Sequence, residues 1–186
     1  PPWKGKSPIQ IEGGLIHDWI AGVLVPHVNV GVALSLFQNY GNYKRVFAPD
    51  VEDSRLLSHE GNRWRAWLRL RRKSAITVRF DSEYEIEYRP LGEQRFALIS
   101  HSTKIRELGE GDQELPPDAS HGFLWRLNSY WLIEPVQQGL YLECRVISLS
   151  RGIPAGLGWI VKPFVSKVPR ESLRTTVEDV QHALER

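Results

Sequence analysis

The sequence contains one cysteine and no methionine among its 186 residues, and it lacks long apolar runs. With Cys144 alone, the chain can form neither an internal disulfide bond nor a multi-cysteine metal site. No apolar run approaches the roughly 20 residues that a transmembrane helix requires. The formal net charge is only +2, which by itself indicates neither a nucleic-acid nor a membrane partner. What remains is the ordinary composition of a globular domain, with 41% hydrophobic and 25% charged residues.

The beginning of the chain differs from the rest in composition. It starts with Pro1 and Pro2 in place of methionine, which loss of an N-terminal signal segment would explain and a shortened sequence would explain equally. We expect export after loss of such a segment rather than a cytoplasmic location. Residues 1–12 carry three prolines and little periodicity, so we expect an extended arm. Residues 13–186 are long enough for one buried core and rather short for two, which predicts a single domain.

An isolated amphipathic helix closes the chain at residues 169–186. Its apolar residues recur at the i, i+4, i+7, i+11 spacing of a single stripe: Leu173, Val177, Val180 and Leu184. Pro169 suits a first helical position, where its missing N–H would be unpaired in any case. Such a stripe must be buried, and the strands that precede it are the available partner. We expect it to meet strand residues in one core, namely Ile76, Val78, Phe80 and Ile86.

The preceding chain changes from a short helical pattern to a long run of strands. Residues 13–25 predict a first strand, and Asn29 is a suitable N-cap for the helix after it. From Val51 onward the pattern is that of strands, with a hairpin turn at residues 60–62. Residues 75–89 alternate between apolar and charged side chains, which predicts a strand of an antiparallel sheet covered on one side.

The last two strands allow a register to be predicted. If Glu134 lies opposite Tyr141, Trp131 meets Cys144 and the apolar side chains share one face. The other face then holds the polar and charged residues of this pair: Arg126, Asn128, Tyr130, Glu143 and Arg145. A slip of one residue would place Trp131 beside Arg145 and mix the two faces, so we predict the first register.

With this order of elements, the chain resembles the START-like (SRPBCC) superfamily, which includes Bet v 1-like and polyketide cyclase/dehydrase-type domains. The resemblance lies in GLIHDWIAGVLVP, in VGVALSLFQNYGNYKRVFAPDVEDSRLL and in IPAGLGWIVKPFVSKVPRESL leading into the last helix. It implies an α+β helix-grip fold: a curved antiparallel sheet of about seven strands wrapped around a long C-terminal helix, with two short helices after the first strand. It also implies an internal cavity for a hydrophobic ligand such as a lipid, sterol or polyketide. A minority of members are enzymes, and no catalytic motif carries over to these residues.

Large side chains that face inward are the candidates for the cavity wall. They come from three of the predicted strands and include one leucine and one serine hydroxyl: Trp64, Leu68, Tyr84, Tyr88, Trp125, Ser129 and Trp131. Trp159 and Phe164 lie in the glycine- and proline-rich residues 151–169, which form either a connecting loop or a lid. In the alternative interpretation of all these residues, they fill the core and leave no cavity. We predict binding of a hydrophobic small molecule, without a cofactor.

Other kinds of site have less support. The six histidines show no metal-ligand spacing, there is no GxSxG motif, and Cys144 alternates with apolar neighbours as a buried hydrophobe does. The basic, tryptophan-containing residues 63–73 could bind nucleic acid or an anionic membrane. We favour a solvated row of arginines opposite Glu83, Glu85 and Glu87, and hence no nucleic-acid partner.

The alternative function is a cyclase- or dehydratase-type enzyme acting on a polyketide-like substrate. It requires the opposite face of the last two strands to point inward, so that Arg126, Tyr130, Glu143 and their polar neighbours line the cavity. Buried charges of that kind are costly, so finding them inside would indicate a functional role.

Overall fold

A single antiparallel sheet carries most of the chain. The computed structural model describes residues 3–4, 8–73, 76–152 and 168–186. The first elements along the chain are β1 (Trp3–Lys4), β2 (Ile9–Ile11), β3 (Gly14–Pro26), α1 (Val30–Gln38), the 3₁₀ turn η1 (Tyr40–Asn42) and α2 (Tyr43–Val46). The long strands follow: β4 (Val51–Glu60), β5 (Arg63–Lys73), β6 (Thr77–Gly92), β7 (Arg95–Leu108), β8 (Arg126–Val136) and β9 (Gly139–Arg151). A 3₁₀ turn η2 (Glu110–Asp112) follows β7, and α4 (Val168–Leu184) ends the described chain.

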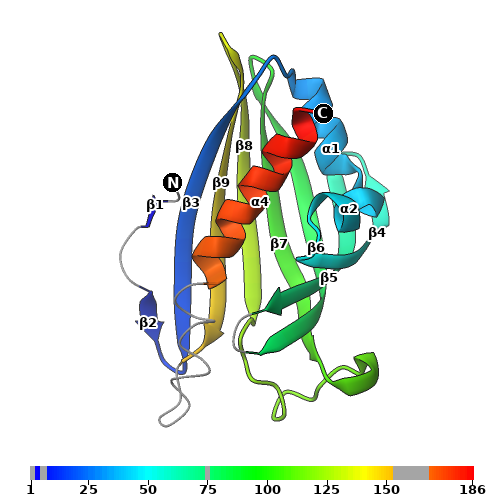
Figure 1. Ribbon diagram of the computed structural model, residues 1–186, viewed down its shortest axis with the longest axis vertical. Helices are drawn as coiled ribbons and strands as arrows, with labels where there is room; N and C mark the ends of the chain where they lie inside the picture. The colour runs from blue at the N-terminus through cyan, green and yellow to red at the C-terminus, as the bar shows by residue number, and fades with distance from the viewer. Residues whose placement is uncertain (1–2, 5–7, 74–75, 153–167) are drawn as a thin grey trace.

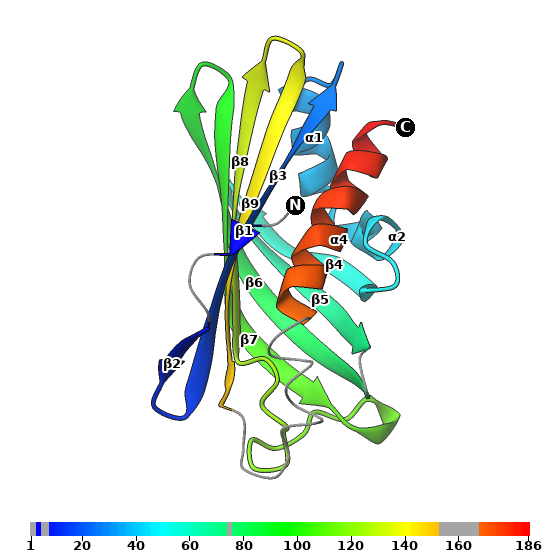
Figure 2. The same ribbon diagram turned by 60° about the vertical axis from the view of Figure 1, so that its left-hand side comes forward.

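The sheet has nine strands in the described part of the chain, in the order β1-β3-β9-β8-β7-β6-β5-β4, with β2 also paired to β3. Helix α4 lies diagonally across its concave face (Figure 1), and α1 and α2 lie on that same side (Figure 2). Seven of the strands are long and two are short, so the predicted α+β helix-grip architecture is confirmed. The described residues of the N-terminal arm form β1 and β2.

Strand β6 shows why these residues form a sheet with one covered face. Its inward side chains are buried at every second position: Val78, Phe80, Ser82, Tyr84, Ile86 and Tyr88. Its outward acids lie opposite the arginines of β5, with Arg65 paired to Glu85 and Arg69 to Asp81. The alternation predicted from the sequence is therefore confirmed, together with the row of paired charges on the outer face.

Helix α1 begins and ends on identifiable contacts. The Asn29 side chain accepts a hydrogen bond from the backbone N–H of Val32 at 3.1 Å, which confirms the predicted N-cap. At the other end, the hydroxyl groups of Tyr88 and Tyr43 both donate to the carbonyl of Phe37, at 2.8 and 2.6 Å. Tyr40 therefore donates to the Tyr88 oxygen, at 2.7 Å. These tyrosines satisfy a helix-end carbonyl and fix α1 to β6.

The stripe of α4 is buried as predicted, but one part of the predicted core is wrong. The four stripe residues share a cluster with Ile86, Phe37 and Trp131. Val78 and Phe80 belong instead to a second cluster, with Val51 and Leu70. The reason is length: α4 has 17 residues and β6 has 16. At about 1.5 Å and 3.3 Å per residue, the helix covers only about half of the strand.

The predicted register of the last two strands is confirmed. Glu134 lies opposite Tyr141 and Trp131 opposite Cys144. Strand β9 also pairs along its whole length with β3. Cys144 is buried, and burial raises the pKa of its thiol.

The two outer edges of the sheet are irregular. The pairing of β4 with β5 is interrupted by register shifts between Val51 and Asp53 and between Leu56 and Ser58. At the other edge, β1 pairs with Trp19 and Ile20 of β3, and β2 pairs with residues 14–16. None of the helices in the described residues combines the length and apolarity needed to cross a membrane.

Candidate ligand-binding cavity

A cavity of about 240 Å³ lies between the concave face of the sheet and the N-terminal half of α4. Its wall is mainly apolar and is formed by β3 to β9, by α1 and α2, and by the N-terminal half of α4. Phe37 and Trp131 line part of this wall and pack against each other in a tilted arrangement, with ring centroids 4.9 Å apart. Phe80 and Leu70 belong to the second core cluster and also reach the wall. The cavity therefore lies where the two core clusters meet, beneath the N-terminal half of α4.

Four of the residues expected at the wall are there: Leu68, Tyr84, Ser129 and Trp131. Strand pairing brings them together, because Leu68 lies on β5, Tyr84 on β6, and Ser129 and Trp131 on β8. Ser129 lies directly opposite Ser100 of β7, which is also part of the wall.

Trp64 and Tyr88 face inward but lie outside the wall of this cavity. Trp64 packs against Tyr40 and Tyr88, with ring centroids 5.8 and 5.5 Å apart, and stacks on His59 at 3.7 Å. The end of α1 covers this part of the sheet and uses both side chains as core. An inward-facing aromatic side chain does not reveal from sequence which element covers it.

Trp125 also lies outside the wall of this cavity and is 40% exposed. Strand β8 begins only at Arg126, and the chain bends at residue 125. Its backbone N–H still donates to the carbonyl of Leu149 at 2.7 Å, but the alternation of faces does not extend through the bend. Trp159 and Phe164 lie outside the described residues.

The polar residues required by the enzyme alternative lie on the outer face, so that arrangement is wrong. Arg126 is exposed, and Arg145 donates to Asp18 at 2.8 Å. The hydroxyl of Tyr130 contacts His101 Nε2 at 3.2 Å. The hydrogen bond from Arg145 lowers the pKa of Asp18, as expected for an ion pair at the surface. The confirmed register places all five of these residues opposite the face that Trp131 occupies.

One polar end of the cavity was missed from the sequence. His17 is 3% exposed, lines the wall, and contacts Ser150 through Nε2 and Oγ at 3.4 Å. Ser148, which lies opposite His17, contributes another hydroxyl group to the wall. His17 has the inward parity of Trp19 and Ala21, so its direction could have been inferred. Its serine neighbours depend on a pairing across more than a hundred residues, which the sequence pattern does not supply.

A second polar group of wall residues lies beneath α4. Arg72 forms an ion pair with the Asp50 carboxylate at 3.2 Å, and Asp179 lies in the same wall on the helix. Burial raises the pKa of Asp179, and the negative charges of Asp50 and Glu178 raise it further, while His182 lowers it. The side chain of Asp179 is therefore held in a site that disfavours its charge.

We expect Asp179→Asn to increase stability at neutral pH. A raised pKa in the folded state means that stability is lost as pH rises from the ordinary aspartate value, about 3.9, through the raised value. The variant should therefore exceed the wild type in free energy of unfolding near pH 7, and the difference should shrink toward pH 3.5. Urea titrations at both pH values measure this. Glu178→Gln, on the exposed side of the same turn, is the control, and an equal gain there would contradict the explanation.

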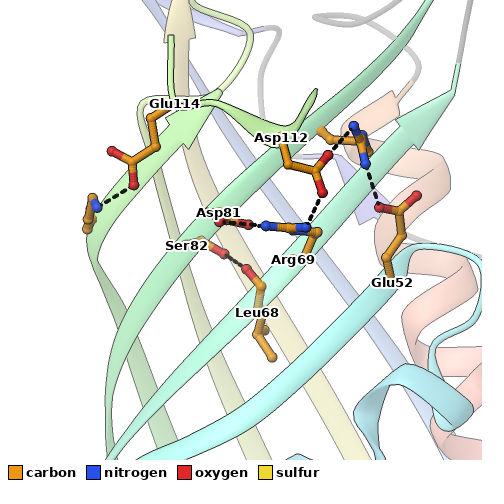
Figure 3. A network of polar contacts seen from close by, with 9 residues as sticks. Glu52, Leu68, Arg69, Asp81, Ser82, Asp112 and Glu114 are labelled. Carbon is orange, nitrogen blue, oxygen red and sulfur yellow. Dashed lines mark hydrogen bonds and ion pairs between the residues drawn. The ribbon is translucent and has the colours of Figure 1, made fainter. Parts of the chain in front are cut away.

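The outer face carries an extended network of ion pairs. Figure 3 shows Arg69 between Asp81, at 2.8 Å, and Asp112, at 2.6 Å. The Asp81 carboxylate raises the pKa of Arg69. Glu52 forms ion pairs with both Arg71 and Arg79, at 3.6 and 3.7 Å. Among the described residues, four of the five arginines at 63–73 thus form ion pairs with acids of the domain: Arg65, Arg69, Arg71 and Arg72. In the described residues no cluster of side chains has the composition of a metal site.

The whole architecture is found in solved structures of other proteins. A STAR-related lipid transfer protein from Xanthomonas axonopodis is 15% identical, covers 100% of this chain and 99% of its own, and gives a TM-score of 0.65. The Zhui aromatase/cyclase from a Streptomyces species is 11% identical over 92% of this chain and 94% of its own, with a TM-score of 0.63. A START superfamily protein from Mycobacterium smegmatis is 9% identical. The match covers 91% of this chain and 97% of that protein, with a TM-score of 0.54.

At these identities the likeness establishes the fold alone. No protein-family model matches the sequence, and no curated protein matches it by sequence. The resemblance to START-like, helix-grip proteins is therefore confirmed as a shared fold. One of the similar structures is named as a lipid transfer protein and another as an aromatase/cyclase, so the same architecture serves both carriers and enzymes.

Proposed function

We propose that this domain binds a hydrophobic small molecule in the cavity between the sheet and α4, and acts by sequestering it without a cofactor. The observation that carries the proposal is the cavity itself. Protein interiors are close-packed, with few voids larger than one water molecule. A space of about 240 Å³ is far larger than the room that one water molecule needs.

The character of the wall supports an apolar ligand. Phe37, Leu68 and Trp131 present rings and methyl groups to the cavity, and burying these surfaces against a ligand is favourable by about 25 cal/mol per Å² of apolar area. A few hydroxyl groups, such as that of Ser129, interrupt the apolar wall, as is typical of small-molecule sites. The lipid transfer protein of the same fold agrees with this proposal.

We prefer a carrier to an enzyme because the polar and charged side chains of β8 and β9 lie on the outer face of the sheet. The five residues that would have handled a carbonyl-rich substrate face away from the cavity. The likeness to an aromatase/cyclase adds no matching residue, because at 11% identity it carries the fold alone. Sequestration is therefore the function that the wall supports best.

Filling the cavity from β8 tests this proposal. Ser129→Phe adds an aromatic ring to the wall, so it should weaken binding of the neutral fluorescent probe N-phenyl-1-naphthylamine at least tenfold. Leu132→Phe places a larger ring on the outer face of the same strand and should leave affinity unchanged. Circular dichroism and thermal melts establish that both variants are folded. Equal affinities in the wild type and both variants, or no binding by the wild type, would refute binding at this site.

Trp131 provides a second readout in the same titration. Because its indole lines the cavity, its fluorescence should change when the probe binds. Trp131→Phe should remove most of that change, whereas Trp125→Phe, outside the cavity, should keep it. The opposite pattern would place the probe outside the cavity.

A further inference from the structure

Two serine hydroxyl groups lie side by side on the cavity wall. Ser100 of β7 is directly opposite Ser129 of β8, and both residues line the cavity. Their inward direction follows from strand alternation, because Leu98 and Trp131, two positions away on the same strands, are buried. Directly opposed residues on one face of a sheet have Cβ atoms about 4.5–5.5 Å apart, so a single atom of a ligand can contact both hydroxyl groups.

Both hydroxyl groups are accessible and have no partner within the part of the chain that the structure describes. Neither Oγ atom makes a hydrogen bond there, and neither is among the fully buried side-chain atoms that lack one. Both residues are partly exposed although they lie in the middle of the sheet, so the surface that remains to them borders the cavity. By contrast, the Ser102 hydroxyl accepts the backbone N–H of Leu127 at 3.0 Å and is used within the fold.

The surroundings of this serine pair are apolar. Apart from Ser102, its direct neighbours on the inner face are hydrophobic residues of the wall: Ile86, Leu98, Leu127, Trp131 and Val146. The arginine of the wall lies farther along the sheet, since Arg72 pairs with Val78, which is about 26 Å from Ile86 along β6. An anionic group held by the two serines would therefore be buried without a counter-charge, which is costly, whereas a neutral oxygen atom needs only the hydroxyl groups themselves.

Resting on the function proposed above, we propose that Ser100 and Ser129 together hold a neutral oxygen of the ligand, such as that of a ketone or a hydroxyl group. Because a serine hydroxyl is both donor and acceptor, the pair can donate twice to a carbonyl oxygen, or donate to and accept from a hydroxyl group. The apolar wall continues on both sides of the pair, so the oxygen is carried on an apolar body. The site selects such a molecule over a pure hydrocarbon and over a carboxylate.

Two probes of nearly equal shape test the serine pair. In 2-acetylnaphthalene a ketone oxygen is present that 2-ethylnaphthalene lacks. The measured quantity is the ratio of ketone to hydrocarbon affinity, obtained by displacement of N-phenyl-1-naphthylamine. Ser100→Ala and Ser129→Ala should each lower this ratio about three- to tenfold, the effect of one hydrogen bond, and the double variant should lower it further. Tyr130→Phe removes a hydroxyl from the outer face of β8 and should leave the ratio unchanged.

The outcomes separate this inference from the proposed function. If neither naphthalene binds the wild type, the proposed function is overturned. If both bind and the serine variants leave their ratio unaltered, the serine pair is overturned while the carrier remains. A lower ratio in only one of the single variants would overturn the joint role of the two hydroxyl groups. Binding of 2-naphthoate as tight as that of the ketone would overturn the restriction to neutral oxygen atoms.

Stability without ligand gives an independent check. Ser100→Ala and Ser129→Ala remove hydroxyl groups that have no partner in the described residues, so the melting temperature of the free protein should stay equal or rise. A clear fall in both variants would show that these hydroxyl groups serve the fold rather than the ligand, and would overturn the inference.

Discussion

Val177→Asp should unfold the domain. Val177 is 5% exposed and lies in the middle of the α4 stripe, where Leu173 and Val180 are also buried. A carboxylate at this point would lose its hydration without gaining a partner, at a cost of more than about 4 kcal/mol. Since domains of this size are stable by only about 5–15 kcal/mol, that cost is comparable with the whole free energy of unfolding. Far-ultraviolet circular dichroism and a thermal melt would report the loss.

The matched control places the same residue at an exposed position of α4, one turn before Val177. Arg174 is exposed and makes only a long ion pair with Glu178, at 3.8 Å. Arg174→Asp should therefore cost about 0.5 kcal/mol, which is typical of a lost surface pair. A cooperative melt of Val177→Asp at the wild-type temperature would contradict the packing of α4 on the sheet.

Phe37→Ala should lower the free energy of unfolding by about 3–5 kcal/mol. Phe37 is 3% exposed and packs on Trp131, so truncation removes buried surface and leaves a void where α1 meets the sheet. The backbone carbonyl that accepts from Tyr43 and Tyr88 is retained, so the measured loss reports side-chain packing. Urea unfolding gives the value from the midpoint and slope of the transition.

Val32 on the same helix provides the comparison for this second variant. Its side chain is 47% exposed, and alanine is the better helix former, so Val32→Ala should be neutral or slightly stabilising. A loss below about 1 kcal/mol for Phe37→Ala would mean that α1 is not held on the sheet by this side chain.

The fold could be predicted because its sequence signals are local or are strongly constrained by burial. The spacing of Leu173 and Val177 in α4 and the cap at Asn29 each depend on a few neighbouring residues. The register of β8 and β9 concerns two consecutive strands joined by a short turn, and a slip of one residue would have put Trp131 beside Arg145. The division of the core into two clusters could not be predicted, since it depends on how far a helix reaches along a curved sheet.

The site was predicted less completely, for a different physical reason. Strand alternation gives the direction of a side chain but not what lies opposite it. Tyr84 and Tyr88 point the same way, yet α1 covers Tyr88 and leaves Tyr84 facing a cavity. Trp125 lies outside the cavity for a simpler reason: the alternation of inward and outward side chains begins only with β8 at Arg126, after the bend. His17 could have been added from parity alone, whereas its contact with Ser150 required the pairing of β3 with β9.

The irregular borders of the sheet have a consequence for the molecule in concentrated solution. A flat strand at a border, with its N–H and C=O groups free, is a template on which another chain can add a strand. Here the register shifts in β4 break such a template on one side. On the other side, β1 and β2 occupy part of β3, and the remaining stretch ends at Pro26, which has no N–H to offer. Self-assembly by strand addition, the route toward amyloid-like aggregates, is therefore disfavoured at both borders.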